Sequence, residues 1–329
     1  MTDTRGMARM DLTVVICTRN RASPLRRTLE NLAATKPSPG TVWELVVVDN
    51  GSTDETAELI SSFADILPVR QIFEPRAGIS NARNAGVDAA RGAYIIWTDD
   101  DVDVGAEWLK AYQRAFRVWP DAAVFGGPIS PLLETPSPAW FAQNIDLLHL
   151  LLATRDFGAL PRPLCVEADI IPFGANFAVR AAEQKQFRYD PEAGAGSGNF
   201  RLGEETAVIK QILLSRATGY WVPDAAVTHR IAVARQSLAY VEDYFIRLGR
   251  TGADDTYIGM RRRRRGGVVE VMDHGGLLCR NRFDEFLESA FMKSPGHEAR
   301  QPERGRQPGL AHCEQAGIHG LGNEMAQNV

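Results

Sequence analysis

Between residues 12 and 98, short runs of β-branched apolar residues alternate with segments of helical periodicity. Four apolar runs predict strands, at Leu12 to Cys17, Glu44 to Asp49, Val69 to Glu74 and Ala93 to Thr98. The segments between them predict helices, at Pro24 to Ala34 with Ser23 as N-cap, Ser52 to Phe63, and Gly78 to Ala90. Such alternation produces a parallel sheet flanked by helices. The continuous apolar runs favour strands that are buried on both faces. We therefore expect a Rossmann-like α/β fold.

The second half of the chain is less regular. Helices are predicted at Trp108 to Phe116 and Gly203 to Ser215, and short strands at Phe177 to Val179 and near Thr228. Residues 126–172 are rich in proline and predict a long binding loop, in which Trp140 and Phe141 either contact an acceptor or are buried. We expect one domain over residues 11–260, with a nucleotide-binding half (11–103) and an acceptor and catalytic half (104–260). A basic linker and a low-order tail are predicted over 261–329.

The composition of the chain limits which binding partners and which cellular location we expect. The formal net charge of -4 gives no reason to expect nucleic-acid binding. The N-terminus lacks the apolar run of a signal peptide, and the four scattered cysteines are predicted to be reduced thiols. These features predict a cytoplasmic protein. The basic run Arg261 to Arg265 leaves two alternatives, a peripheral contact with the inner face of a membrane or a linker that is solvated or attracts nucleic acid non-specifically.

Polar residues follow each predicted strand of the first half, where ligands bind in parallel sheets. Three adjacent aspartates, Asp99, Asp100 and Asp101, follow the fourth strand directly. Carboxylates so close together repel one another unless a cation or hydrogen-bond donors compensate. Asp99 and Asp101 point the same way on an extended chain, so the pair predicts a site for Mn²⁺ or Mg²⁺. An exposed acidic loop is the alternative interpretation.

Several segments occur in a characteristic order: TVVICTRNR, ELVVVDNGSTDET, AGISNARNAG, YIIWTDDDV, PFGANFAVR, GEET and VPDAAVTHR. Over about residues 11–250 this series resembles glycosyltransferase family 2. The resemblance implies the GT-A fold and inverting transfer of a sugar from a nucleotide-sugar donor, typically a UDP-sugar. It also implies that Mn²⁺ or Mg²⁺ assists departure of the diphosphate. The implied acceptor is a hydroxyl of a glycan or of a lipid-linked saccharide.

The resemblance assigns roles to individual residues. The donor nucleotide would contact Thr18, Arg19, Asp49, Arg83, Asp99 and Asp100. The metal would be held by Asp101, Asp99 and His229, and the donor sugar would face Gly174 and Asn176. The catalytic base would be Glu205 or Glu204. Plainer interpretations stand beside these roles, including a turn residue for Asp49 and favourable charge at a helix N-terminus for the two glutamates.

Two positions depart from the family pattern. The second acidic residue of the pair is Glu205 where the family usually has aspartate, and Ala207 stands where another acidic residue is frequent. These departures keep open a second hypothesis, a catalytically inactive module that binds nucleotide-sugars or glycans. A nucleotidylyltransferase is a third hypothesis, but TRNRASP lacks the glycine-rich phosphate loop that it requires.

Overall fold

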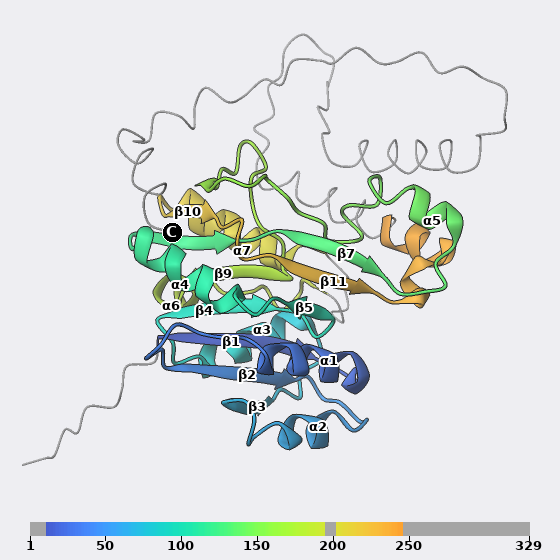
Figure 1. Cartoon of the computed structure of the whole chain (residues 1–329), viewed down its shortest axis with the longest axis horizontal. Coiled ribbons are helices and arrows are strands. Elements are labelled where there is room, and N and C mark those ends of the chain that lie inside the picture. The colour runs from blue at the N-terminus through green and yellow to red at the C-terminus, as the bar shows by residue number, and fades with distance from the viewer. Residues whose placement is uncertain (1–10, 195–201, 246–329) are drawn as a thin grey trace, which may run out of the picture.

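The computed structural model describes residues 11–194 and 202–245. Within these residues the chain forms an eight-stranded sheet and a three-stranded sheet, surrounded by helices (Figure 1). The spatial order in the large sheet is β3 (Val69–Phe73), β2 (Trp43–Asp49), β1 (Leu12–Thr18), β4 (Tyr94–Thr98), β9 (Asn176–Arg180), β6 (Ala122–Gly126), β10 (Thr218–Trp221) and β8 (Arg162–Pro163).

The first four strands of the chain run parallel, as the sequence predicts. The predicted strand at 177–179 is β9, which lies antiparallel between β4 and β6. The parallel pair β6 and β10 extends the sheet on the far side of β9. The mixed α/β architecture is therefore confirmed, with one reversed strand at the centre of the sheet.

Successive side chains of the central strands face opposite sides of the sheet. Val14 and Ile16 pack into one apolar cluster and Val15 into another. Helices α1 (Ala22–Ala33), α2 (Thr56–Ser62) and α4 (Trp108–Val118) cover the first side. Helices α3 (Ile79–Ala89), α6 (Ala181–Gln186) and α7 (Glu204–Leu214) cover the second. Both sides of the central strands β1, β2 and β4 are thus buried, which explains their continuous apolar runs.

The small sheet consists of β5 (Val102–Val104), β11 (Val227–Ile231) and β7 (Ile129–Leu133), and Figure 1 shows it above the first four strands. In this sheet β11 is antiparallel to β5 and parallel to β7. Since β5 begins directly after the three aspartates, this pairing brings the region around Thr228 to the end of β4.

The region 126–172 is more ordered than the predicted loop. It contains β7, α5 (Ala139–Gln143) and β8, and its leucines pack with Phe141 and Ile231 into a third apolar cluster. Phe141 is fully buried, so of its two interpretations the buried one is correct. The sequence failed here because prolines dominate the pattern although apolar side chains between them form a core.

Other local predictions need correction. Helix α1 begins at Ala22, so Ser23 is not its N-cap; the backbone N–H of Ala22 instead donates to Asp54 (3.2 Å). Cys17 is a free thiol, as predicted, and Cys279 and Cys313 lie outside the described residues. The predicted basic linker and tail lie outside the described residues. No helix within the described part of the chain is long and apolar enough to cross a membrane.

Candidate active site

Asp49 ends β2 in a turn that its own side chain closes. Its Oδ1 accepts a hydrogen bond from the backbone N–H of Ser52 (2.8 Å), and its Oδ2 accepts one from Gln71 (3.3 Å). Only 3% of Asp49 is exposed. The turn-residue interpretation is therefore correct as local structure. It does not exclude a role in binding, because each carboxylate oxygen can accept more than one hydrogen bond.

Asn50 ties the loop after β2 to the loop after β3. Its Nδ2 donates to the carbonyls of Glu74 (2.9 Å) and Arg76 (2.7 Å), and its Oδ1 accepts from the N–H of Gly78 (2.9 Å). Gly78, with φ +117°, then begins α3 in a conformation that favours glycine. This network fixes α3, which carries Arg83, relative to Asp49.

Asp100 is held entirely by protein groups. Its Oδ2 accepts from the hydroxyl of Thr18 (2.6 Å) and its Oδ1 from Nε of Arg21 (2.8 Å). Burial raises the pKa of Asp100 to about 6, although the charge of Arg21 opposes the shift. Thr18 and Asp100, both predicted to contact the donor nucleotide, thus bind each other.

Asp101 faces a histidine from the small sheet. Its Oδ1 lies 3.3 Å from Nε2 of His229, and its Oδ2 accepts from Nη2 of Arg21 (2.6 Å). Burial alone would raise the pKa of Asp101, but the contact with His229 and the charge of Arg21 hold it below its usual range. Asp101 is therefore ionised over the physiological range of pH.

The ring of His229 is oriented from both sides. Nδ1 lies 2.9 Å from the carbonyl oxygen of Leu152, which can only accept, so Nδ1 carries a hydrogen. Nε2 faces both Asp101 and Nη1 of Arg235, at 3.2 Å from the latter. When the ring is protonated, Nε2–H donates to Asp101; when it is neutral, the lone pair of Nε2 faces this cluster and accepts from Nη1 of Arg235, which is the orientation of a metal-binding histidine.

Asp99 differs from its two neighbours. It is half-buried and makes no hydrogen bond or ion pair with the residues that the structure describes. Burial raises its pKa, while the charge of Arg83 opposes the shift. Asp99 is not gathered with Asp101 and His229 into a cluster of three metal ligands; no such cluster exists within 11–194 and 202–245. Of the three residues predicted to hold a metal, Asp101 and His229 lie together and Asp99 stands apart from them.

Arg83 of α3 joins the strand ends to the start of α7. Its Nη1 lies 3.2 Å from Oε1 of Glu204 and 3.3 Å from Oε2 of Glu205, and its guanidinium carbon lies 5.4 Å from the centre of the Tyr189 ring. Only 6% of Arg83 is exposed, so its guanidinium is buried in the protein and not solvated. Burial, and then the charge of Glu205, raise the pKa of Glu204 to about 7.

The two residues predicted to face the donor sugar differ in their surroundings. Gly174 lies against this ion-pair group: a Cβ on Gly174 would come within 2.9 Å of Nη2 of Arg83 and 3.0 Å of Oε1 of Glu205. Asn176 is fully buried, and its amide makes four hydrogen bonds, with Trp108, Tyr112, Pro128 and Ala225. The sugar role of Asn176 is therefore a wrong prediction, because no hydrogen-bonding capacity is left for a hydroxyl.

Three arginines at this edge were missed by the sequence reasoning. Arg21 holds two of the aspartates, Arg235 contacts His229, and Arg230 contacts Asp103. Arg21 stands within TRNR, next to the predicted Arg19, and a search for partners of the aspartates could have found it. Arg19 itself is exposed.

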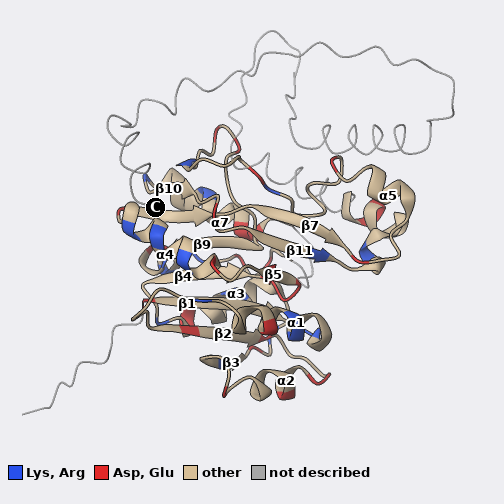
Figure 2. Cartoon of the chain, viewed as in Figure 1, with Lys and Arg blue, Asp and Glu red and all other residues tan. Residues whose placement is uncertain are grey.

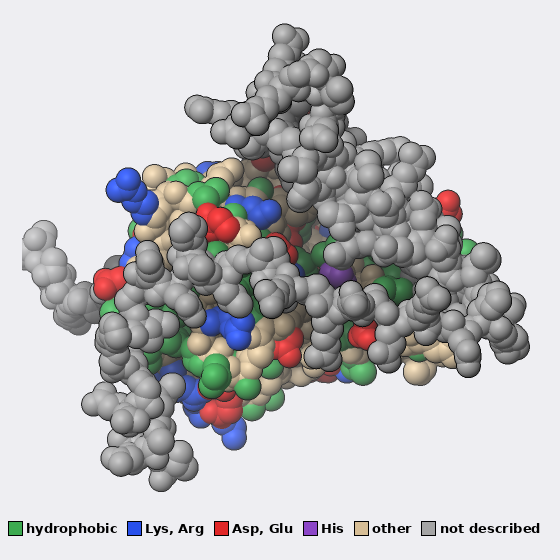
Figure 3. Space-filling view, turned by 90° about the horizontal axis from the view of Figure 1, so that it is seen from above, with side chains coloured by type: hydrophobic (Ala, Val, Ile, Leu, Met, Phe, Trp, Pro, Cys, Tyr) green, Lys and Arg blue, Asp and Glu red, His purple; other side chains and the backbone are tan. Residues whose placement is uncertain are grey.

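Charge pairs join α1 to the small sheet. Arg27 and Arg230 both pair with Asp103, and Figure 2 shows basic segments of α1 and β11 close to the acidic segment at β5. Elsewhere the two signs are mixed: on the face drawn in Figure 3, acidic and basic side chains are interspersed. After β4, by contrast, Asp100, Asp101 and Asp103 are each paired with an arginine.

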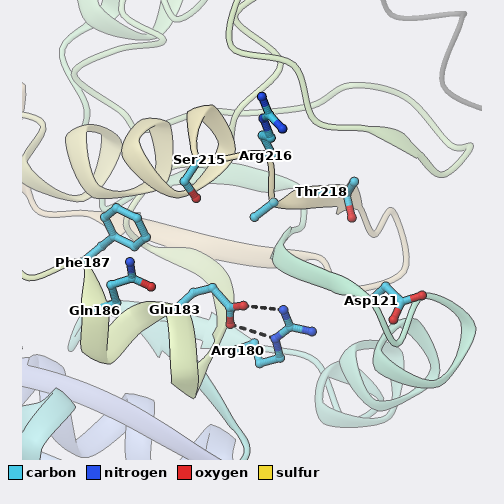
Figure 4. A pocket seen from close by; sticks show the side chains of 9 residues that line it. Asp121, Arg180, Glu183, Gln186, Phe187, Ser215, Arg216 and Thr218 are labelled. Atoms are coloured by element: carbon cyan, nitrogen blue, oxygen red, sulfur yellow. Dashed lines mark hydrogen bonds and ion pairs between the residues drawn. The ribbon is translucent and has the colours of Figure 1, made fainter.

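A separate open pocket lies at the opposite edge of the large sheet (Figure 4). Arg180 pairs there with Tyr94, the first residue of β4, and Thr218 is the first residue of β10. Both oxygens of Glu183 are engaged by Arg180. None of the predicted site residues lines this pocket, so it is distinct from the candidate active site.

Residues 13–152 match the family model described as Glycosyl transferase family 2. The chain has a family 2 glycosyltransferase domain. Validoxylamine A glucosyltransferase of Streptomyces hygroscopicus subsp. limoneus is 35% identical over 106 residues. That alignment covers 32% of this chain but only 23% of the relative, so the similarity reaches about a quarter of that protein. The succinoglycan biosynthesis protein ExoO of Rhizobium meliloti is 26% identical over 282 residues, which cover 80% of this chain and 72% of ExoO.

Solved structures support the fold of the family 2 domain. The structure of S. aureus TarS in complex with UDP-GlcNAc superposes with a TM-score of 0.53 at 16% identity, covering 87% of this chain and 74% of that one. The mannosyltransferase PcManGT of Pyrobaculum calidifontis, in complex with GDP-Man and Mn²⁺, gives 0.53 at 17% identity, covering 88% and 77%. At this identity the likeness concerns the fold, and it confirms the predicted GT-A architecture.

Proposed function

We propose that this chain is an inverting glycosyltransferase that moves a sugar from a nucleoside diphosphate donor, a UDP-sugar, to an acceptor hydroxyl. The observation that carries the proposal is the meeting of Asp101 and His229 at the carboxyl end of β4, beside Asp49 at the end of β2. Ligands of parallel α/β sheets bind at this edge. The acceptor is a glycan or a lipid-linked saccharide, and the reaction takes place in the cytoplasm, with a peripheral membrane contact as an alternative.

A divalent cation fits Asp101 and His229. Cis ligands of an octahedral Mg²⁺ lie about 3 Å apart, and the 3.3 Å between Oδ1 and Nε2 agrees with that spacing. The carbonyl of Leu152 keeps the hydrogen on Nδ1, so Nε2 can coordinate. A bound Mn²⁺ or Mg²⁺ would neutralise the charge that grows on the leaving diphosphate. The remaining ligands would be diphosphate oxygens and water, as is usual for Mg²⁺.

The base is assigned to Glu205. Glu205 lies against Gly174, and 17% of its side chain is exposed against 8% for Glu204, so Glu205 is the more accessible of the two to an acceptor hydroxyl. Glu205 would accept the proton of the acceptor hydroxyl as that oxygen attacks the anomeric carbon. Glu204 would hold Arg83 in place. A positioned base contributes about 10²- to 10⁴-fold to the rate.

The nucleoside end of the donor is assigned to β1 and β2. Asp49 would accept a hydrogen bond from the base, and Thr18 and Arg19 would lie along the nucleoside. Arg83, Asp99 and Asp100 would face the ribose and the diphosphate. Asp99 suits this role because its carboxylate makes no bond with the described residues and remains free to accept from ribose hydroxyls.

The test is a donor screen that measures release of nucleoside diphosphate. Purified protein would be incubated with UDP-sugars and GDP-sugars, with Mn²⁺ or with EDTA, in the presence of saccharide acceptors. We expect release from a UDP-sugar that depends on Mn²⁺ and falls about 10²-fold or more in Glu205→Gln, with a smaller loss in Glu204→Gln. Tight binding of UDP and Mn²⁺ without release from any donor would instead support an inactive binding module. If the protein bound neither UDP nor GDP, the proposal would be overturned.

A further inference from the structure

Arg235 lies inside the candidate site, and none of the roles above uses it. It belongs to the short helix η1 (Val233–Gln236), which follows β11. Its Nη1 is 3.2 Å from Nε2 of His229 and 3.6 Å from Oδ2 of Asp101. The side chain is 22% exposed, so one side of it is open to a ligand. The guanidinium of Arg235 therefore contacts both His229 and Asp101, the residues that we assign to the cation.

The hydrogen bonds of Arg235 are poorly satisfied. Its Nε is buried and has no partner among the described residues, and its Nη2 reaches the carbonyl of Leu151 only at 3.4 Å. A guanidinium has five N–H donors in a planar fork, which matches the oxygens of a phosphate group. A buried N–H without a partner is unfavourable, so an anion with several oxygens would stabilise this side chain.

The backbone that carries Arg235 is firmly anchored, whereas its side chain is long. The neighbouring Gln236 is fully buried, and its Nε2 donates to the carbonyls of Glu134 (2.9 Å) and Ile231 (2.8 Å). The guanidinium can therefore leave His229 by rotating about side-chain bonds without displacing η1 or β11. The aromatic ring of Tyr240 lies 5.7 Å from its central carbon and offers a further surface along this path.

We propose that Arg235 is a diphosphate-binding residue that exchanges partners when the donor arrives. This inference rests on the proposed function. With no donor bound, Nη1 occupies the lone pair of His229 that a cation needs, and the positive charge compensates Asp101. When a cation and a diphosphate bind together, the cation takes that lone pair. The fork of Arg235 then donates to the phosphate oxygens as a bidentate, charge-assisted pair.

The exchange predicts two effects of opposite sign. Replacing Arg235 by methionine removes a phosphate ligand, so binding of a diphosphate becomes weaker. The same change removes a competitor from His229, so binding of the cation alone becomes tighter. If Arg235 had only a structural role, its replacement would weaken the binding of both the diphosphate and the cation. The opposite signs therefore separate the proposal from simple damage to the site.

The test compares Arg235→Met and Arg235→Lys with wild type and with Arg114→Met. Arg114 is an exposed arginine of α4, paired with Asp224. Calorimetry with UDP and with GDP in the presence of Mn²⁺ would measure diphosphate binding, with uridine and guanosine as nucleoside probes. Electron paramagnetic resonance would follow Mn²⁺ without nucleotide, and melting curves would establish folding.

We expect Arg235→Met to weaken UDP binding about tenfold or more and to leave uridine binding within about twofold, since the lost contact is to phosphate. Arg235→Met should bind Mn²⁺ alone several-fold more tightly than wild type does. The affinities of Arg235→Lys should lie between those of wild type and Arg235→Met, and the affinities of Arg114→Met should match those of wild type. Unchanged UDP affinity, an equal loss for uridine, or weaker Mn²⁺ binding in a folded Arg235→Met would each overturn the inference while leaving the proposed function intact. A wild-type protein that binds neither UDP nor GDP would overturn both.

Discussion

Asp101 and His229 are brought within 3.3 Å of each other by strand pairing. The backbone N–H of Arg230 donates to the carbonyl of Asp101 (2.9 Å), and His229 is opposite Val102 in the register of β11 and β5. The positions of the two side chains thus follow from a sheet that crosses between the two halves of the chain. The family 2 domain model ends at residue 152, so it includes Asp101 but not His229.

Loss of either member of this pair should abolish tight cation binding. In the presence of UDP, we expect Asp101→Asn and His229→Gln each to weaken Mn²⁺ binding by about tenfold or more, because ligands and their immediate supports tune metal affinity on this scale. Paramagnetic resonance of Mn²⁺ measures the effect directly. Asp224→Asn, at a carboxylate whose side chain is 70% exposed, is the matched control and should bind normally. Normal Mn²⁺ affinity in both site variants would remove the metal assignment.

Asp49 should act on the nucleoside and not on the phosphates. Asp49→Asn keeps an oxygen for the Ser52 N–H but loses the charge and an acceptor, so uridine and UDP should both bind about tenfold more weakly. Binding of inorganic pyrophosphate with Mn²⁺ should not change. Asp65→Asn, in an exposed position after α2, serves as the control. Equal losses for uridine and pyrophosphate in calorimetry would contradict a base-specific role.

Glu204 should make stability fall as the pH rises. Its pKa is about 7 in the folded protein against the 4.5 of an unperturbed glutamate, so between these values the folded state holds a proton that the unfolded state has lost. The free energy of unfolding therefore declines from pH 4.5 to pH 7, by about 3 kcal/mol for a shift of this size. Glutamine cannot ionise, so Glu204→Gln should unfold at a higher temperature than wild type at pH 8.

The comparison at acid pH provides the check on this result. At pH 4.5 the side chain of Glu204 is largely protonated in the folded state, so wild type and Glu204→Gln should melt within a few degrees of each other. An exposed carboxylate variant such as Glu58→Gln should show no such divergence with pH. Parallel melting curves for wild type and Glu204→Gln from pH 4.5 to 8 would show that the burial of Glu204 has no energetic consequence.

Gly174 should tolerate no side chain. The Cβ of alanine would stand 2.9 Å from Nη2 of Arg83 and 3.0 Å from Oε1 of Glu205, so the ion-pair group would have to shift. We expect Gly174→Ala to lose about 1–3 kcal/mol of stability and most of its turnover. Gly105→Ala is the control, because a Cβ there meets nothing within 4 Å. Equal melting temperatures and equal turnover in both variants would refute the crowding argument.

The fold of residues 11–103 was predictable because its pattern is local. The runs at β1, β2 and β4 are apolar and followed by polar residues, so both these strands and the edge at which they end could be identified. Parallel pairing then places Asp49 and the three aspartates together without knowledge of any side-chain contact.

The small sheet and its consequences could not be predicted in this way. β5 and β11 have three and five residues, too short for a clear periodicity, and they pair across most of the described chain. The third arginine of this edge, Arg235, lies on a helix of four residues with no motif around it. For Asn176 the sequence predicted a role that the structure does not show. The residue stands within a family motif, yet its amide oxygen accepts hydrogen bonds from the buried side chains of Trp108 and Tyr112.

The register of β11 determines whether a histidine or an arginine faces Asp101. His229 and Arg230 are adjacent on this strand, and they serve opposite faces: one meets Asp101, and the other meets Asp103 and the carbonyl of Pro24. Because side chains alternate along a strand, a slip of one residue would replace an imidazole by a permanent cation at the same point. In a chain misassembled in this way, the metal site proposed above would repel Mn²⁺. Metal uptake would thus report directly on whether β11 has docked in its native register.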